Sequence, residues 1–296
     1  MADIKKYIHD KRSSLSASSI TTYASILKSL YRKVFDSDDY DLDKFAHQTE
    51  KVLHYLKEIP ANRRKTILSA LVIITDKQEY RTQMMQDVKA YNQEIHLQEK
   101  TETQKENWVS AEDIKQVFDE CQKTANLLYK KSSLKPTDLQ QIQSFIILSL
   151  LSGLFIAPRR SKDYCDFKIK NINKTDDNFL DKNTMSFNSY KTAKAYGLQK
   201  IEIPPALKKI LTKWQSVNPT EWLLFDTNMN KLSSVKLNQR LNKIFDGKHI
   251  AVNNLRHSYL TDKYATHSEK EKALANDMKE MGSSLNMAET YIKLDK

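Results

Sequence analysis

The scarcity of glycine constrains the fold of this chain more than any other feature of its sequence. Only four of its 296 residues are glycine. Glycine supplies the positive backbone φ angles that tight turns and phosphate-binding loops need, so the composition predicts a mostly helical protein and excludes a glycine-rich nucleotide loop. Apolar residues recur at helical spacing along much of the chain, for example at Ile20, Tyr23 and Leu27.

The N-terminal third of the chain has the pattern of a compact helical domain. Apolar residues at helical spacing predict helices over residues 13–34, 43–57, 61–76 and 78–96. Residues 98–108 are polar and lack this periodicity, which is typical of a linker between domains. We therefore expect a helical domain over residues 1–97, a linker over 98–108 and a second domain over 109–296.

The second domain combines helical patterns with a few short strands. Helices are predicted over residues 110–128, 136–153, 205–215, 235–246, 252–266 and 268–281. Three short runs, 164–169, 184–187 and 199–203, have the composition of β-strands. Residues 188–197 lie between the last two runs and predict a basic hairpin with Lys191 and Lys194 near its tip. The predicted fold class is mainly α with a small antiparallel β-sheet.

The positive charge of the chain is concentrated in one region. The formal charge is +11, and residues 151–250 alone carry 18 Lys and Arg against 9 Asp and Glu. A concentrated positive field favours a polyanion as the partner. The basic triplet Arg63, Arg64 and Lys65, at a predicted helix start, is a candidate phosphate contact in the first domain.

Cysteine use and hydropathy indicate where the protein works. The two cysteines, Cys121 and Cys165, form neither a disulfide framework nor a metal-ligand cluster in the sequence, so we expect no metal and a reducing compartment. No apolar run reaches membrane-spanning length, and the first residues lack the apolar core of a signal peptide. We expect an intracellular location, in the cytoplasm, nucleus or a viral factory, and no membrane partner.

Three motifs of the second domain carry residues suited to phosphoryl chemistry. The first is Pro158-Arg159-Arg160-Ser161-Lys162-Asp163, in which the carboxylate stands one helical turn after Arg160 and is placed to orient its guanidinium. The second is Asn253-Asn254-Leu255-Arg256-His257-Ser258, at a predicted helix start. The third begins with Met281-Gly282-Ser283-Ser284 and ends at Tyr291. An arginine that grips a phosphate, followed by a tyrosine on a terminal segment, suits transfer through a covalent phosphotyrosine.

The order and spacing of these elements resemble the tyrosine recombinase (phage integrase-like) family. The resemblance covers residues 108–296, and it reaches the first domain only by its helical pattern. It implies a core-binding-like helical domain followed by an α+β catalytic domain. The Arg-Arg-x-x-Asp-Tyr and Asn-x-x-Arg motifs look most like the branch found in giant viruses, virophages and large DNA transposons.

The resemblance assigns roles to individual residues. It matches Arg160 to the family's first arginine, Lys191 to its hairpin lysine, Arg256 to its second arginine and Tyr291 to its nucleophile. Arg159 and Lys194 remain open as alternatives to Arg160 and Lys191, and both are also candidate DNA contacts. The sequence departs from the family pattern at Asn253, where a histidine is usual, and at Ser283, where a histidine or tryptophan is usual. Asparagine and serine keep hydrogen-bonding capacity but do not titrate near neutral pH.

The activity that this resemblance implies is site-specific recombination of double-stranded DNA. Tyr291 would attack a DNA phosphodiester, form a 3′-phosphotyrosyl bond and release a 5′-hydroxyl, without any cofactor, metal or small-molecule substrate. We expect four copies of the chain to assemble on two duplexes, with residues 268–291 exchanged between them. Two rival functions share the residues: a type IB topoisomerase-like nicking and religating enzyme, and a decayed integrase that only binds DNA.

Overall fold

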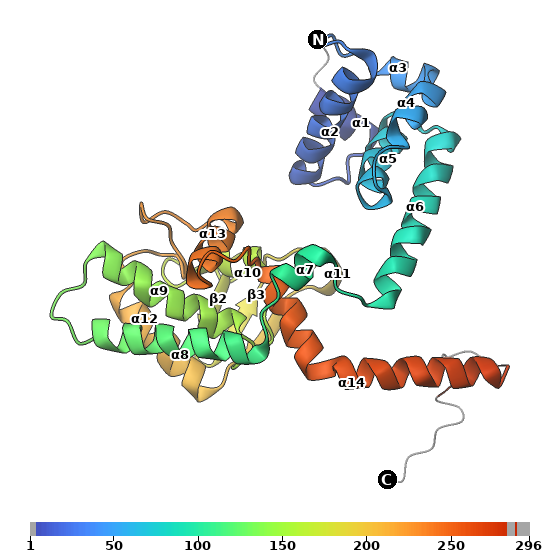
Figure 1. Cartoon of the computed structure of the whole chain (residues 1–296). Coiled ribbons are helices and arrows are strands. Elements are labelled where there is room, and N and C mark those ends of the chain that lie inside the picture. Colours follow the sequence, from blue (N-terminus) through green and yellow to red (C-terminus); the bar gives the residue numbers. More distant parts are fainter. Residues whose placement is uncertain (1–3, 283–287, 289–296) are drawn as a thin grey trace. The chain divides into compact units, whose positions relative to one another are not determined.

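The computed structural model describes residues 4–282 and Ala288 (Figure 1). Contacts between Cα atoms divide the chain into two compact units, Met1–Lys100 and Thr101–Lys296. The division falls within the polar segment 98–108. That segment carries a short helix, α7 (Glu102–Glu106), which begins with a capping box between Thr101 and Gln104.

The first unit is entirely helical in its described residues. Its helices are α1 (Ile4–Lys11), α2 (Ala17–Phe35), α3 (Asp43–His47), α4 (Thr49–Leu56), α5 (Ala61–Thr75) and α6 (Gln78–Leu97). Their apolar faces share one core, in which Tyr31 is fully buried and packs against Phe35 and Phe45. The sequence did not predict α1, because eight residues with two buried isoleucines are too few for a helical period to be recognised.

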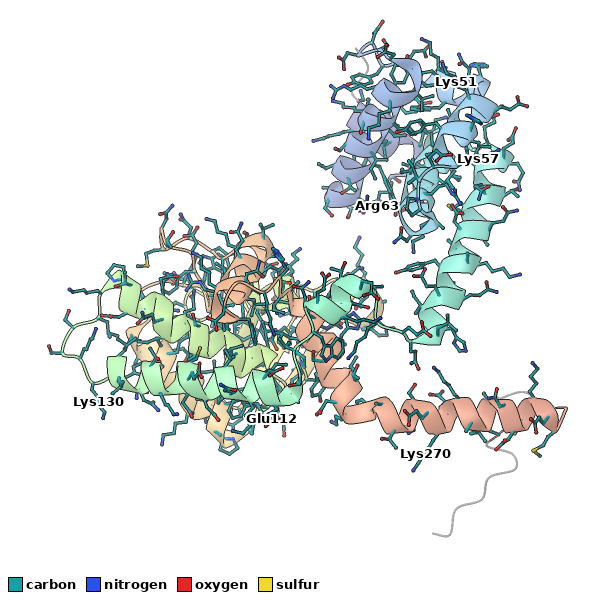
Figure 2. All side chains as sticks on the ribbon, in the orientation of Figure 1. Lys51, Lys57, Arg63, Glu112, Lys130 and Lys270 are labelled. Carbon is teal, nitrogen blue, oxygen red and sulfur yellow. The ribbon has the colours of Figure 1, made fainter. Side chains whose placement is uncertain are left out.

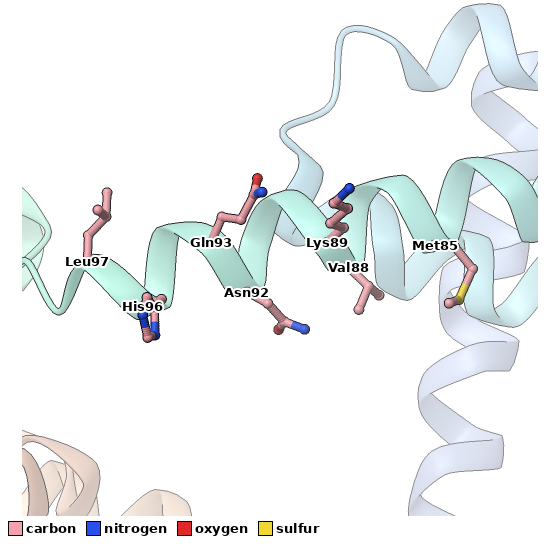
Figure 3. A pocket seen from close by; sticks show the side chains of 7 residues that line it. All are labelled: Met85, Val88, Lys89, Asn92, Gln93, His96 and Leu97. Atoms are coloured by element: carbon pink, nitrogen blue, oxygen red, sulfur yellow. The ribbon is translucent and has the colours of Figure 1, made fainter. Parts of the chain in front are cut away.

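The C-terminal half of α6 lies largely outside this core. Ile95 and Leu97 are each more than half exposed, and so is Met85 near the middle of the helix. A shallow depression runs along this one helix and is lined by side chains from Met85 to Leu97 (Figure 3). The apolar periodicity of α6 therefore serves the core only in its first half.

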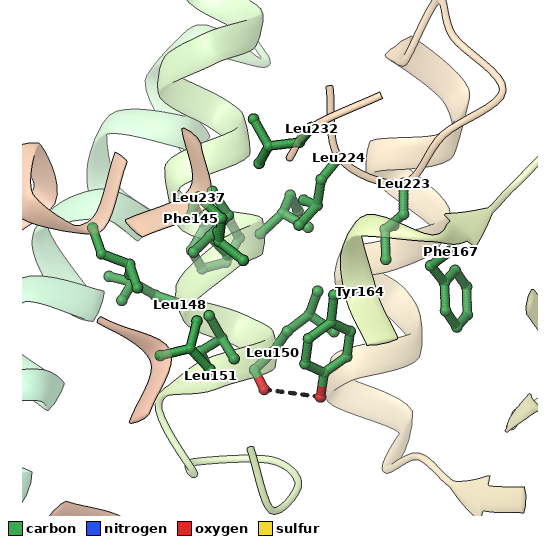
Figure 4. Packing of buried hydrophobic residues seen from close by; sticks show 14 of the residues in the cluster. Phe145, Leu148, Leu150, Leu151, Tyr164, Phe167, Leu223, Leu224, Leu232 and Leu237 are labelled. Carbon is green, nitrogen blue, oxygen red and sulfur yellow. Dashed lines mark hydrogen bonds between the residues drawn. The ribbon is translucent and has the colours of Figure 1, made fainter. Parts of the chain in front are cut away.

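The second unit contains most of the helices and all of the described strands. Its longer helices are α8 (Ala111–Leu128), α9 (Pro136–Leu151), α12 (Pro205–Val217), α13 (Ser234–Ile244) and α14 (Val252–Glu280), and its short ones are α7, α10 (Ser161–Cys165) and α11 (Ala193–Tyr196). Helices α8 and α9 run antiparallel, side by side (Figure 1). Most of α9 is buried, and its Leu148 and Leu151 belong to the same core cluster as Leu237 (Figure 4). The hydroxyl of Tyr164 on α10 donates to the Leu150 carbonyl at 3.2 Å, which fixes α10 against the end of α9.

A four-stranded sheet covers part of this core. Its strands are β1 (Phe167–Lys168), β2 (Asn178–Asp181), β3 (Thr184–Phe187) and β4 (Gln199–Glu202), in the order β1-β2-β3-β4. Strands β3 and β4 pair antiparallel, with Met185 opposite Ile201, and so form the predicted hairpin. The fold class, mainly α with a small sheet, is confirmed.

Two details of the predicted sheet were wrong. Strand β1 pairs parallel with β2, so the sheet is mixed and not purely antiparallel. Tyr164 and Cys165 belong to the short helix α10, because the chain turns into a helix directly after Arg160, and only the end of the predicted strand 164–169 is extended. Strand β2 was not predicted, because its sequence Asn-Phe-Leu-Asp is short and half polar.

The last described helix, α14, is one continuous helix of 29 residues. The sequence predicted two helices, over 252–266 and 268–281, because the apolar period fades between them. No glycine or proline interrupts α14, so the backbone continues without a break. Within α14, Met278 is the only buried residue after Ser258, so most of the second half of the helix is solvated. Among the described residues, no helix is long and apolar enough to cross a membrane.

Candidate functional site

Asp163 forms an ion pair with Arg159, and this pair organises the first arginine motif. The Nε atom of Arg159 lies 2.8 Å from the Oδ2 atom of Asp163, and the two side chains are 14% and 3% exposed. We had expected the carboxylate to orient Arg160. The hydrogen bond of the carboxylate goes to Arg159 instead, and Arg160 occupies the extended N-cap position of α10.

The rest of the Arg159 guanidinium is held by the β3–β4 hairpin. Its Nη1 atom donates to the Gln199 side-chain oxygen at 2.8 Å. The guanidinium carbon lies 4.0 Å from the ring centre of Phe187 and 5.1 Å from that of Tyr190. Arg159 is thus engaged on several sides within the protein, and this favours Arg160 over Arg159 as the arginine available to a ligand.

Three positive charges act on the Asp163 carboxyl group. Burial raises the pKa of Asp163, and the charges of Arg159, Arg160 and Arg256 oppose that rise. The Oδ1 atom of Asp163 is buried without a hydrogen-bond partner among the described residues. The charges of both arginine motifs, in which Arg160 and Arg256 are 96 residues apart in sequence, therefore act on this one carboxylate.

Within this group of charged residues, Arg160 and Arg256 have few hydrogen-bond partners among the described residues. Arg160 is half-buried, and its guanidinium makes no hydrogen bond or ion pair with any residue that the structure describes. Arg256 is also half-buried, and its one hydrogen-bond partner among the described residues is the Asn253 side-chain oxygen, 3.4 Å from Nη1. Two planar cations with free hydrogen-bonding capacity beside a buried carboxylate form a suitable site for a phosphate.

The first two turns of α14, which carry Arg256, are anchored in the core of the second unit. Val252 and Leu255 are buried in the core of the second unit. The Ser258 hydroxyl is also buried and donates to the Val109 carbonyl at 2.6 Å. Residues three apart share a face of a helix, so Asn253 and Arg256 lie together beside this buried face, where Asn253 is exposed and Arg256 is half-buried. His257 is exposed.

Lys191 and Lys194 are both exposed on the connection between β3 and β4. Lys191 directly follows Tyr190, whose hydroxyl donates to the Gly197 carbonyl at 2.6 Å and closes the loop that contains α11. The hairpin is thus anchored at its base and exposed at its tip. Both lysines are exposed, so only the sequence motif favours Lys191 over Lys194 as the hairpin lysine.

Sequence reasoning missed two residues that shape this site. Asn178 is fully buried on β2 and hydrogen-bonds both the Asp163 backbone and Ser189. Gln199, at the start of β4, holds the guanidinium of Arg159. No sequence signal distinguishes them from ordinary polar residues, because their roles depend on partners that lie 11 to 40 residues away.

The basic triplet of the first unit has three different environments. Arg63 is exposed on α5 (Figure 2). Arg64 donates to both carboxylate oxygens of Asp87, at 2.8 and 2.7 Å, so its charge is engaged within the unit and its DNA-contacting role stays a prediction. The Nζ atom of Lys65 lies 2.9 Å from the ring centre of Tyr91. Only Arg63 presents an unengaged charge.

Two expected site residues, Ser283 and Tyr291, lie outside the described residues. Within the described part of the chain, no group of three or more His, Cys, Asp or Glu side chains is arranged to hold a metal ion.

Comparison with known proteins gives structural likenesses alone. No protein-family model and no curated protein matches this chain. Among solved structures, it is similar to a crystal structure of XerA recombinase, with 11% identity, a TM-score of 0.37, and coverage of 87% of this chain and 82% of that one. It is also similar to a lambda integrase dimer bound to a COC′ core site, with 15% identity, a TM-score of 0.45, and coverage of 90% and 70%. A second such complex, of lambda integrase residues 75–356, gives 16% identity, a TM-score of 0.44, and coverage of 90% and 92%.

Proposed function

We propose that this protein is a site-specific DNA recombinase of the tyrosine type, which breaks and rejoins DNA strands through a 3′-phosphotyrosyl intermediate. The observation that carries the proposal is the pair Arg160 and Arg256, whose charges both act on the buried Asp163 carboxylate and whose guanidiniums have no strong partner among the described residues. The family resemblance of the motifs and the exposed lysine hairpin support it. Neither arginine motif alone would suggest this chemistry.

Each residue of the proposed site has a chemical task. The Tyr291 oxygen attacks the phosphorus atom, the bond to the 5′-oxygen breaks, and Lys191 supplies the proton that this leaving oxygen needs. Arg160 and Arg256 contact the non-bridging oxygens, where negative charge grows in the transition state. One preorganised contact of this kind contributes about 3–4 kcal/mol of transition-state stabilisation. Asn253 orients Arg256 by accepting its hydrogen bond, and Ser283 is assigned the remaining phosphate contact of the motif.

The partner we propose is double-stranded DNA, held by both units. The charge surplus of residues 151–250 and the exposed cations Arg63, Lys191 and Lys194 suit contact with phosphates. Binding should therefore weaken steeply as salt rises. We further propose that four copies act on two duplexes, and that the division at Lys100 separates a DNA-gripping unit from a catalytic one. Free thiols at Cys121 and Cys165 fit a reducing compartment.

The test is covalent trapping on a nicked suicide substrate that carries the DNA sequence on which the protein acts. Wild-type protein should form a covalent protein–DNA adduct, and Tyr291→Phe should form none. Arg256→Ala should lower the adduct yield by more than 100-fold, given the contribution of one such contact. An adduct that survives Tyr291→Phe would move the nucleophile to another tyrosine.

Two other outcomes would replace the proposal. Tight, salt-dependent DNA binding without any adduct would favour the binding-only function, which the absence of histidine at Asn253 and Ser283 makes the main alternative. Relaxation of supercoiled DNA without a defined site would favour the topoisomerase-like enzyme.

A further inference from the structure

We propose that Arg159 is a positioning residue, which fixes the hairpin that bears Lys191 relative to the two phosphate-binding arginines. The inference rests on the proposed function, in which Lys191 protonates the leaving 5′-oxygen. Arg159 does not touch the substrate in this scheme. It acts through the geometry of the proton donor.

The contacts of Arg159 bridge the two halves of the site. On one side its Nε atom binds the Asp163 carboxylate at 2.8 Å, next to the charges of Arg160 and Arg256. On the other side its guanidinium carbon lies 4.0 Å from the ring centre of Phe187 and 5.1 Å from that of Tyr190, the residue before Lys191, and its Nη1 atom donates to Gln199 at 2.8 Å. Contacts thus reach the hairpin both before and after Lys191.

A second bridge runs from the backbone of Asp163 to the same part of the hairpin. The side-chain amide of Asn178 donates to the Asp163 carbonyl at 3.0 Å and to the Ser189 carbonyl at 2.8 Å. The Ser189 N–H donates back to the Asn178 side-chain oxygen at 2.8 Å. Asp163 is therefore tied to the hairpin by its side chain through Arg159 and by its backbone through Asn178.

At the tip of the hairpin, Ala193 packs against the core of the second unit, and most of the other side chains are exposed. Lys191 and Lys194 are exposed, and Tyr196 is 70% exposed. The position of the Lys191 amine therefore depends on the base of the hairpin, where Arg159 and Asn178 lie. Loss of the Arg159 bridge should misplace the proton donor while the nucleophile and the Arg160 and Arg256 side chains remain.

A substrate with sulfur in place of the 5′-bridging oxygen separates a loss of proton donation from a loss of the phosphate contacts. With the normal substrate, the bond from phosphorus to the 5′-oxygen breaks as the bond to the tyrosine oxygen forms, and the leaving alkoxide takes a proton. With the sulfur substrate the leaving group is a thiolate, the conjugate base of a thiol of pKa about 8.5, which leaves without a proton. A variant that lacks only proton donation is therefore rescued by sulfur.

The experiment compares cleavage rates of the two substrates for Arg159→Met and Gln199→Leu. General acid catalysis contributes about 10²- to 10⁴-fold, so Arg159→Met should slow cleavage of the oxygen substrate by about 10- to 100-fold and the sulfur substrate by less than about 3-fold. Gln199→Leu removes only the hairpin side of the bridge and keeps the pair with Asp163. It should show the same substrate dependence with a smaller loss.

Two control variants give the readout its meaning. Arg160→Ala should lose cleavage of both substrates, because it removes a contact to the phosphate. Arg64→Met breaks a matched buried pair, with Asp87, in the other unit and should show no difference between the substrates. Equal losses on both substrates for Arg159→Met and Gln199→Leu would overturn the inference. No adduct from wild-type protein with either substrate would instead overturn the proposed function.

Discussion

The ring of Tyr259 lies against Gly153, so close that a Cβ atom added to Gly153 would stand 2.4 Å from the Tyr259 Cδ2 atom. Gly153 follows α9 with a φ angle of +82° and begins the segment that leads to Arg159 and Arg160. Tyr259 stands on α14, three residues after Arg256. The contact therefore joins the segment that leads to Arg159 and Arg160 to the helix that carries Arg256.

Replacement of Gly153 by alanine should destabilise the protein. The positive φ angle and the clash with the Tyr259 ring act together, so we expect a loss of about 2–4 kcal/mol in the free energy of unfolding. Gly247→Ala is the matched control, because Gly247 has a φ angle of +86° and no atom within 4 Å of the added Cβ. Its loss should be about 1–2 kcal/mol. Urea unfolding measures both, and equal losses would contradict a role for the Tyr259 contact.

The Arg64–Asp87 pair should matter more to stability than an exposed pair of the same unit. Asp87 raises the pKa of Arg64, and the two side chains are 18% and 3% exposed. Arg64→Ala leaves a buried carboxylate without its partner, so we expect a loss of about 3 kcal/mol. Arg81→Ala, which breaks an exposed pair with Asp76, should cost less than about 1 kcal/mol. Thermal unfolding of the two variants should differ clearly, and similar melting temperatures would refute the assignment.

Both thiols should be unreactive in the folded protein at pH 8. Burial raises the pKa of Cys165 to about 12 and that of Cys121 to about 11, so almost no thiolate is present. Both folded pKa values exceed the unfolded value, so the unfolded state loses these protons first and stability falls as pH rises from about 8.5 through the folded pKa values. Alkylation followed by mass spectrometry should label neither thiol quickly in the native protein and both in urea. As pH rises, Cys121 should react before Cys165, and the reverse order would be inconsistent with their burial.

Hydrogen exchange along α14 should fall into two regimes. The first turns are anchored by Val252, Leu255 and Ser258, whereas only Met278 is buried beyond them. Backbone amides in the anchored part should be protected as strongly as those of α9. A solvated helix with few buried contacts opens locally at low cost, so amides beyond Leu260 should exchange much faster. Uniform protection along the helix would show that its second half has a partner in solution.

Local patterns predicted the elements of the site that depend on nearby residues. The β3–β4 hairpin with Lys191 followed from two strand-like runs around a basic turn, and the start of α14 followed from helical spacing at Val252 and Leu255. These features are encoded within about ten residues of the chain.

Features that depend on distant partners were not predictable. The pairing of Asp163 with Arg159 in place of Arg160 depends on the residue at which α10 begins and on Gln199, 40 residues away from Arg159. The continuity of α14 was also missed, because a solvated helix has no apolar period to recognise.

The length of α14 has a mechanical consequence. Twenty-four residues separate Arg256 from Glu280, which corresponds to at most about 36 Å along the helix axis at 1.5 Å per residue. A rotation of about 5° at the anchored end would therefore move the far end by about 3 Å. Because Tyr259 packs against Gly153 only three residues after Arg256, a partner bound to the solvated end of α14 would disturb Arg256 only when it kept the whole helix formed.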